Sequence, residues 1–372
     1  MVRDGTPGSD LVSGLFDTTL TIVLFLAILV VLVFVHEVGH FVVARLTGVR
    51  VHEFGVGFPP RLARLGSDGE TEYTLNWLPL GGFVRMEGEE GESEDPRAFV
   101  RQGLGKRLTI LVAGVVMNLA LAFVIFTVIA WTFEPVAETR VESVSAGSPA
   151  ASVGLVEGDV ITKVDGRTFP YFDNLAPTAY MRDRAGQQVT LTVERASGQT
   201  EELPVTLRGA EDVAAGKGAL GIGARFTLGN TIERTPLEAI RLGAERTVEA
   251  CGMVLGALRD LVVSVVSDPG SAPPVSGPIG IAQAIGTVRT QAPPVVLFWL
   301  VAVLSANLAV VNILPFPPLD GGRMAVALIQ AVTRNRINVR LERATYFIGF
   351  LLLMAFILWV SYFDIVRGSA GA

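Results

Sequence analysis

Three side chains of the types used in hydrolytic metal sites stand together in VFVHEVGHFVVAR, residues 33–45. His36 and His40 are four residues apart, so a helix would place both imidazoles on one face, one turn apart. Two imidazoles so placed can bind one zinc ion, and Glu37 can act as general base for a water molecule at the metal. The motif lies near the end of an apolar run that begins at Leu20, so this chemistry is expected inside a membrane-spanning helix.

A catalytic zinc ion needs a third protein ligand and keeps one position open. We expect Asp320, in NILPFPPLDGGR, because the prolines before it end a helix and leave it at the same membrane depth as the two histidines. His52 is the other candidate, but its polar neighbours favour a solvated loop residue. The alternative for Asp320 is that it caps the N-terminus of the following helix. The alternative for HEVGH is that it matches the zinc-binding pattern by chance on a packed helix. Ionisable groups isolated at this depth cost about 2.5 kcal/mol or more each, which favours one shared zinc site per chain.

The composition favours an integral membrane protein. Half of the 372 residues are hydrophobic, the mean hydropathy is +0.49, and the apolar residues cluster in blocks. The charges that sum to −6 lie in loops, and no basic patch suggests binding to nucleic acid. The single cysteine, Cys251, excludes an intrachain disulfide and is expected to be a small apolar residue on a helix.

Four transmembrane helices are expected, because four segments supply the roughly 20 residues that a bilayer core requires. They are residues 18–46, 108–133, 295–322 and 346–366, between tails at 1–17 and 367–372. The second contains Gly114 and Asn118, for which close helix packing and one interhelical hydrogen bond are the simplest roles. Thr235, Pro236 and Glu238 predict a capping box that opens a further helix, whose early charges favour a position along the membrane surface.

The first loop, residues 47–107, is predicted to contain β-structure. Residues 49–58 and 72–78 have the composition of strands, and a turn is expected between them at 66–69. The segment LPLGGFV, residues 78–84, is apolar but rich in Pro and Gly. It therefore suits an exposed or re-entrant strand edge better than a helix.

Residues 136–208 are predicted to form a separate β-rich domain. They include SPAASVGLVEGDVITKVDG, which has the layout of a PDZ domain. Such a domain binds an extended peptide or a chain end by strand addition, and the alternative is a β-rich spacer without a ligand. The connector at 209–294 has one possible strand at 220–226, and residues 323–345 form a short connection.

Basic residues near the span ends predict the orientation. The segments 47–107 and 323–345 are rich in arginine, whereas the tails carry only Arg3 and Arg367. The positive-inside rule then puts both basic segments in the cytoplasm, with both termini and the PDZ-like domain outside. The expected fold class is an α-helical polytopic membrane protein with four transmembrane helices, a membrane-associated β-hairpin and an inserted PDZ-like α+β domain.

The sequence resembles the site-2 protease family of intramembrane zinc metalloproteases, specifically its bacterial PDZ-containing members of the regulator of sigma-E protease type. HEVGH resembles the family's first motif, and NILPFPPLDGG its Asn-x-x-Pro-x-Pro-x-x-Asp-Gly motif. SGPIGIA and LPLGGFV are also similar, so the resemblance covers nearly the whole chain. The chain departs in GVVMN, where the family usually has Gly-Pro before the Asn, and in its single PDZ copy, where some relatives have two.

The resemblance implies a zinc endopeptidase of the bacterial inner membrane that cuts in or near transmembrane segments during regulated intramembrane proteolysis. The implied substrates are single-pass proteins already shortened by another protease, such as anti-sigma factors, or remnant signal peptides. A substrate helix must unwind before it is cut, because its amides are satisfied internally. The residues implied to hold the unwound segment are Gly81, Gly82, Phe83, Val84, Asn118, Asn307, Asn312 and Pro315.

Two other functions are weighed against this one. A membrane zinc transporter could use intramembrane His and Asp side chains as a cation path, but a single HExxH and a peptide-binding domain fit it poorly. A non-catalytic membrane scaffold could act through the PDZ-like domain alone, and the intact Glu37 argues against it.

Overall fold

The computed structural model describes residues 7–89, 93–172, 177–268, 270–333 and 339–370. The chain divides into two compact units. The membrane unit combines Met1–Phe126 with Leu242–Ala372, and the β unit is Thr127–Arg241. HEVGH, NILPFPPLDGGR and the first loop all belong to the membrane unit.

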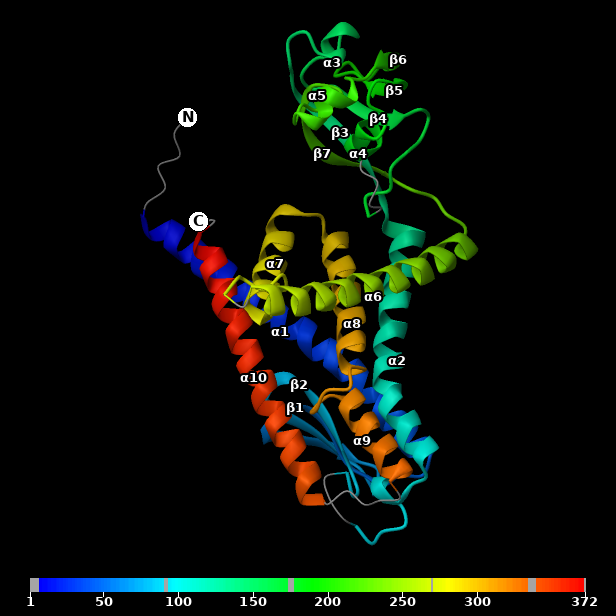
Figure 1. Ribbon diagram of the computed structural model, residues 1–372, viewed down its shortest axis with the longest axis vertical. Coiled ribbons are helices and arrows are strands. Elements are labelled where there is room, and N and C mark those ends of the chain that lie inside the picture. The colour runs from blue at the N-terminus through cyan, green and yellow to red at the C-terminus, as the bar shows by residue number, and fades with distance from the viewer. Residues whose placement is uncertain (1–6, 90–92, 173–176, 269, 334–338, 371–372) are drawn as a thin grey trace. The chain divides into compact units, whose positions relative to one another are not determined.

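Long apolar helices make up most of the membrane unit (Figure 1). Five helices of the described residues are long and apolar enough to cross a bilayer: α1 (Pro7–Leu46), α2 (Leu104–Val128), α6 (Pro236–Ser267), α8 (Pro294–Asn312) and α10 (Val339–Ala370). A π-helical turn, Ile129–Phe133, continues α2. α1 begins within the stretch expected to be a tail. These helices make the chain a multi-pass membrane protein.

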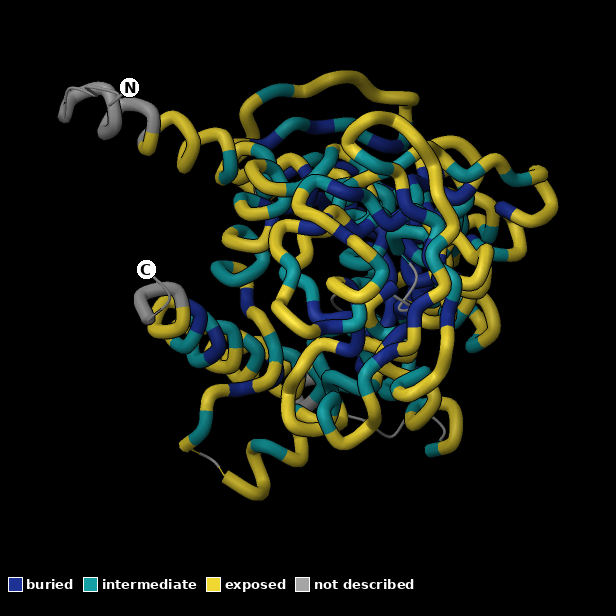
Figure 2. The backbone as a smooth tube through the Cα atoms, turned by 90° about the horizontal axis from the view of Figure 1, so that it is seen from above, coloured by how far each residue is buried: buried dark blue, intermediate teal, exposed yellow. Residues whose placement is uncertain are grey.

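The long helices expose apolar side chains instead of burying them. Phe16 and Val23 of α1 are exposed, and Figure 2 shows yellow turns directly after the grey N-terminal segment. Phe347 and Leu352 are similarly exposed on α10. Such faces would be unfavourable in water, and they match the hydrocarbon core of a bilayer.

α6 is the additional long helix, which the sequence places along the membrane surface. Its predicted capping box is confirmed, because the N–H of Thr235 donates to Glu238 Oε2 at 2.9 Å and the N–H of Glu238 donates to Thr235 Oγ1 at 3.4 Å. Figure 1 shows α6 running crosswise to α2, α8 and α10. Ala250 of α6 is buried in one cluster with Ala122 and Ala302, so α6 packs across α2 and α8 through small residues.

β1 (Val51–Ser67) and β2 (Glu72–Met86) form the antiparallel hairpin expected in the first loop. Both strands bend, so residues 51–56 of β1 pair on one side with 82–86 and on the other with 72–75. The rest of β1 pairs with residues 72–78, and its residues 61–67 lie on the far side of 72–76. Within the described residues, 82–86 therefore form one edge of a curled sheet, and LPLGGFV runs into that edge.

A hydrophobic core fixes this edge beside α1. Its buried members come from α1, the hairpin, the 3-10 turn Phe99–Arg101 and α2, and include Ala44, Val49, Val51, Phe54, Val84, Met86, Phe99, Ile110 and Leu111. Burying one large apolar side chain contributes about 1.5–3 kcal/mol. Gly81 permits the close approach, because its φ is 129° and a Cβ there would lie 2.8 Å from Val33 Cγ1.

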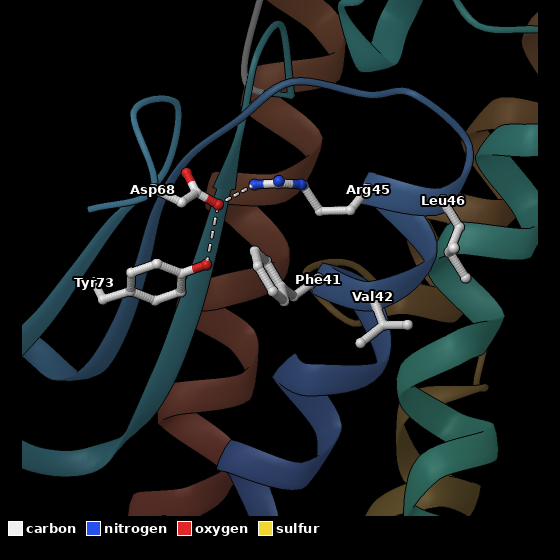
Figure 3. Close-up of a pocket in the computed structure, with 6 residues that line it drawn as sticks. All are labelled: Phe41, Val42, Arg45, Leu46, Asp68 and Tyr73. Carbon is white, nitrogen blue, oxygen red and sulfur yellow. Dashed lines mark hydrogen bonds and ion pairs between the residues drawn. The ribbon is translucent and has the colours of Figure 1, made fainter. Parts of the chain in front are cut away.

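A polar junction holds the last turn of α1 to the hairpin turn (Figure 3). Arg45 pairs with Asp68 at 2.7 Å, and the Tyr73 hydroxyl donates to the same carboxylate at 3.3 Å. The N–H of Thr71, with Arg45 and the N–H of Glu70, holds the pKa of Asp68 well below its usual range. A cavity of about 330 Å³ beside them is lined by Phe41, Val42, Arg45, Leu46, Asp68 and Tyr73. None of the predicted site residues lines this cavity, so we assign it a structural role.

The segment after α8 turns sharply into α9 (Asp320–Val332). Glycine is required at this turn. A Cβ at Gly321 would lie 2.2 Å from Ile313 O, and one at Gly322 would lie 2.6 Å from Pro317 N. The two glycines of LDGGR thus let α9 pack directly against the chain that precedes it.

α7 (Pro278–Gln291) starts in SGPIGIA and is capped by a buried carboxylate of α10. Asp364 Oδ2 accepts the N–H groups of Gly277 and Gly280, both at 2.9 Å. A Cβ at either glycine would lie 2.9 Å from that carboxylate, which accounts for the glycines of the motif. At its other end, Arg289 of α7 pairs with Asp17 of α1 at 3.0 Å.

The described part of the β unit forms a five-stranded antiparallel sheet in the order β6-β5-β4-β3-β7. Its elements are β3 (Pro135–Val144), α3 (Pro149–Ser152), β4 (Val160–Val164), α4 (Pro177–Arg182), β5 (Gln188–Glu194), β6 (Thr200–Thr206), α5 (Ala210–Ala214) and β7 (Ile222–Thr231). Alternate residues of β5, including Leu191 and Val193, lie in one core. β7 pairs with β3, so the unit extends past residue 208 into the predicted connector. Within the described residues β7 has a neighbouring strand on one side only.

Candidate metal centre

α1 and α9 bring three potential ligands together. His36 and His40 lie one turn apart on α1, are 5 % and 6 % exposed, and have their Nε2 atoms 3.1 Å apart. Asp320, the first residue of α9, places Oδ2 2.9 Å from His36 Nε2 and 3.2 Å from His40 Nε2. Among the described residues, these three form the group of His and acidic side chains that could hold one metal ion. They are the three residues that the sequence predicts.

The donor set suits zinc. Zinc takes His nitrogen and carboxylate oxygen at about 2.0–2.2 Å in a tetrahedral arrangement, which puts neighbouring ligand atoms about 3.4 Å apart. The spacing of 2.9–3.2 Å between these atoms is slightly tighter, so a small outward shift would seat the ion. Asp320 is also not the N-cap of α9. That position is Leu319, which makes no side-chain cap.

The other ring nitrogens have partners that suit metal binding through Nε2. His40 Nδ1 lies 2.8 Å from Ile110 O and donates to it, so its Nε2 carries a lone pair. His36 Nδ1 lies 3.2 Å from the Asn118 side-chain nitrogen, while Asn118 Oδ1 is buried without a partner in the described chain. Nitrogen and oxygen of an amide are assigned from such networks, and the turned amide would accept from His36 Nδ1–H. Both imidazoles would then offer Nε2 to the metal.

Two glycines allow α1 and α2 to approach at the site. A Cβ at Gly39 of α1 would lie 2.4 Å from Ala113 O. A Cβ at Gly114 of α2 would lie 2.6 Å from both His36 Cε1 and His40 Nε2. The bare backbone of α2 is therefore packed against both imidazole rings, and close packing at Gly114 is confirmed as a requirement of the site itself.

Glu37 faces the hairpin. A Cβ at Gly82 would lie 3.7 Å from Glu37 Cγ and 2.9 Å from Gly55 O. The carboxylate side chain of Glu37 thus lies against the strand edge formed by residues 82–86. A proton acceptor stands next to the three potential ligands, on the side where the hairpin begins its edge.

The other predicted substrate residues lie in two places. On the hairpin, Phe83 stacks on Phe58 with ring centroids 6.2 Å apart, and Val84 is buried in the core. On α8, Asn307 and Asn312 are half-buried, and neither amide has a hydrogen-bond partner among the described residues.

Pro315, the last of these predicted residues, is exposed in the turn after α8. Asn118 instead lies against His36, with its backbone carbonyl accepting from Ser305 Oγ at 2.8 Å. His52, the alternative ligand, pairs with Glu87 at 2.5 Å and lies outside the ligand group.

The β unit contains a groove that was not predicted from the sequence. A cavity of about 390 Å³ lies between α4 and the start of β7, lined by Thr178, Ala179, Met181, Arg182, Val213, Gly216, Lys217, Gly218, Ala219, Leu220, Gly221, Ile222 and Ala224. The signal that could have found it is the run Gly-Ala-Leu-Gly-Ile directly before a strand. Glycines at this place let backbone N–H groups reach a ligand.

Comparisons with known proteins show which family and which proteins the chain is similar to. The model of peptidase family M50 matches residues 24–356, which include HEVGH and LDGGR. A protein of Clostridium perfringens named as a zinc metalloprotease is 35 % identical over 336 residues, which cover 90 % of this chain and 95 % of that protein. One of Brucella suis is 31 % identical over 370 residues, covering 93 % and 95 %. Metalloprotease MmpA of Caulobacter vibrioides is 30 % identical over 390 residues, again covering 93 % and 95 %.

The contact at Gly114 predicts the effect of a single methyl group. Gly114→Ala should push the two imidazoles off their positions, and the zinc content of the purified chain should fall to near zero. Gly105→Ala is the matched control, because it lies on the same helix and a Cβ there meets no atom within 4 Å. Elemental analysis measures both variants. Full zinc content in Gly114→Ala would contradict the close packing of α2 on the site.

Proposed function

Because the chain belongs to peptidase family M50, the site-2 protease family, and is a zinc metalloprotease, we propose that it cuts single-pass membrane proteins in or near their transmembrane segments. The observation that carries this proposal is the position of the ligand group. Its three members come from one apolar helix and from the turn after another, with Glu37 between them and a strand edge. Chemistry at this depth acts on substrates that are themselves in the membrane.

In this proposal His36, His40 and Asp320 hold one zinc ion through their facing Nε2 and Oδ2 atoms. Zinc bound there would polarise the scissile carbonyl and lower the pKa of a water molecule to about 7. Glu37 takes a proton from that water and later delivers it to the leaving amine. Ile110 O and the Asn118 side chain contact the Nδ1 atoms of His40 and His36, and keep both rings in the tautomer with the proton on Nδ1.

The substrate is held as an extended segment, because a helix hides its peptide bonds. Residues 82–85 form a strand edge beside Glu37, to which an unwound segment adds as a further strand. The side-chain amides of Asn307 and Asn312 on α8, and the turn at Pro315 after it, are proposed to support the same segment. Asn118 contributes through His36, which it contacts.

The proposed topology has four spans in the inner membrane of a bacterium, with both termini and the β unit outside the cytoplasm. α1 and α8 both run toward the metal centre, and α2 runs away from it. α6 therefore starts on the outer side, and its continuation α7 is tied by Arg289 to Asp17, near the outer start of α1. If α6 crossed the bilayer, α7 would lie on the cytoplasmic side, away from Asp17. We therefore propose that α6 lies along the outer surface, with its charged side chains in water.

The β unit is proposed to bind chain ends as a PDZ-like domain. The carbonyls of Ala219, Leu220 and Gly221 accept hydrogen bonds from Arg208 N, Ala150 N and Ser145 N. In trans peptides the N–H of the next residue points the opposite way, so the amides of Leu220 and Gly221 turn away from these bonds. Successive amides of this kind bind a carboxylate, and the free edge of β7 accepts the strand that carries it. A first protease would create such a carboxylate.

Replacing the general base tests the reaction. Reconstituted wild-type protein should cleave a single-pass helical substrate and lose this activity with a zinc chelator. Glu37→Gln should bind zinc but lower kcat by at least about 100-fold. Equal cleavage by Glu37→Gln would remove Glu37 from the chemistry. Zinc flux in proteoliposomes, or peptide binding without any cleavage, would support the transporter or the scaffold instead.

Strand pairing at the edge is tested with proline. Phe83→Pro interrupts the strand that carries this edge, and the loss of hydrogen bonds to the substrate, at roughly 1 kcal/mol each, should lower kcat/KM about 10-fold or more. Zinc content should stay unchanged. Leu65→Pro, at the exposed opposite edge of the same sheet, is the control and should cleave normally. Normal cleavage by Phe83→Pro would show that the substrate does not pair there.

The carboxylate groove is tested by peptide binding to the full-length chain. A peptide with a free C-terminus and an apolar last residue should bind about 10-fold or more tightly than its C-terminal amide, measured by fluorescence anisotropy. Lys217→Glu in the groove should abolish this difference, and Lys163→Glu on the exposed face of β4 should preserve it. Equal binding of acid and amide by the wild type would contradict recognition of chain ends.

A further inference from the structure

An ion pair joins the helix that carries Asp320 to the strand that lies beside Glu37. Arg323 of α9 pairs with Glu89 in the turn that follows β2. The other carboxylate oxygen of Glu89, Oε2, accepts the N–H of Met86 at 3.2 Å, and Met86 is the last residue of β2. One carboxylate therefore binds both the guanidinium on α9 and the backbone end of the strand.

Asp320 and Arg323 are three residues apart, so they share one face of α9. That face turns Asp320 toward the two histidines and Arg323 toward the hairpin. A rotation of α9 about its axis would break both contacts together. The pair is also shielded, since the side chains of Arg323 and Glu89 are 33 % and 13 % exposed. A partly buried pair holds its geometry better than an exposed one, and loss of one partner costs more.

The far end of α9 is held by different groups. Gln330 accepts from Arg107 of α2 at 3.0 Å and donates to Glu342 of α10 at 2.8 Å. These contacts lie at the opposite end of α9 from Asp320, so they fix where the helix points and leave its first turn to nearer contacts. Gly321 and Gly322 set how closely that turn approaches the preceding chain. The Arg323–Glu89 pair is the charged contact that fixes its rotation.

We propose that Arg323 and Glu89 are positioning residues that hold Asp320 in place for zinc and tie it to the strand edge. The inference rests on the proposed function, because it takes Asp320 as a zinc ligand and residues 82–86 as the substrate edge. Neither residue touches the metal or the substrate. Their effect is to make the first turn of α9 and the end of β2 move as one body, so that the ligand and the edge keep their spacing.

Zinc affinity of the purified full-length chain, measured by competition with a chelator, tests the pair. Arg323→Gln and Glu89→Gln should each weaken zinc binding about 10- to 100-fold, the range for partners that orient a ligand. The two changes together should cost no more than the larger single effect, because they remove the same contact. Arg323→Lys should keep part of the affinity. The double variant Glu89→Arg with Arg323→Glu exchanges the two charges. It should bind zinc more tightly than either single variant, Glu89→Arg or Arg323→Glu.

Glu70→Gln is the matched control. It breaks the Arg97–Glu70 pair, which joins two segments of the first loop outside the ligand group, and should leave zinc affinity unchanged. Circular dichroism measures helix content and so identifies a variant that fails to fold. In that case, Arg323→Lys and the double variant with exchanged charges test the inference. Unchanged zinc affinity in a folded Arg323→Gln variant would overturn this inference. The proposed function would still stand if the wild-type protein binds zinc and cleaves the substrate. A wild type that binds no zinc would overturn both.

Discussion

The contact of Asp320 with His36 and His40 is the constraint on which the membrane unit depends. Charged side chains cost about 2.5 kcal/mol or more in apolar membrane helices, so each member of this group needs polar partners. Asp320 lies 284 positions from His36, and no local preference of the chain joins them. The packing of α1, α2, α8 and α9 does so, and glycine at 39, 114, 321 and 322 lets backbones approach where any Cβ would interfere.

The features that follow from short-range geometry could be predicted from the sequence. The spacing of His36 and His40 sets one helix face, and Thr235 with Glu238 sets a helix start, whatever the rest of the chain does. The strands of the first loop follow from β-branched composition and a Gly-containing turn. The position of Asp320 beside the two histidines also followed, because helix rise and proline breaks place it at a definite depth.

Features that depend on which neighbour a residue meets could not be predicted. The helix face of Asn118 is fixed by its position, but only packing decides that it meets His36. β7 has a pattern that suits several partners, and its pairing with β3 is a property of the whole sheet. The polar, Gly-containing start of α1 looked like a tail because propensity is a weak guide when the following 30 residues are strongly helical.

The cap that Asp364 places on α7 has a consequence for the order in which the protein is made. A ribosome adds about 5–20 residues per second, so Asp320 follows the two histidines by roughly 15–60 s. α10, which holds α7 through Asp364, leaves the ribosome later still. For most of its synthesis the chain therefore carries the two histidines without Asp320, and α7 stays uncapped until Asp364 has been made. Under the proposed function, such a nascent protease cannot attack neighbouring membrane chains until Asp320 has been made.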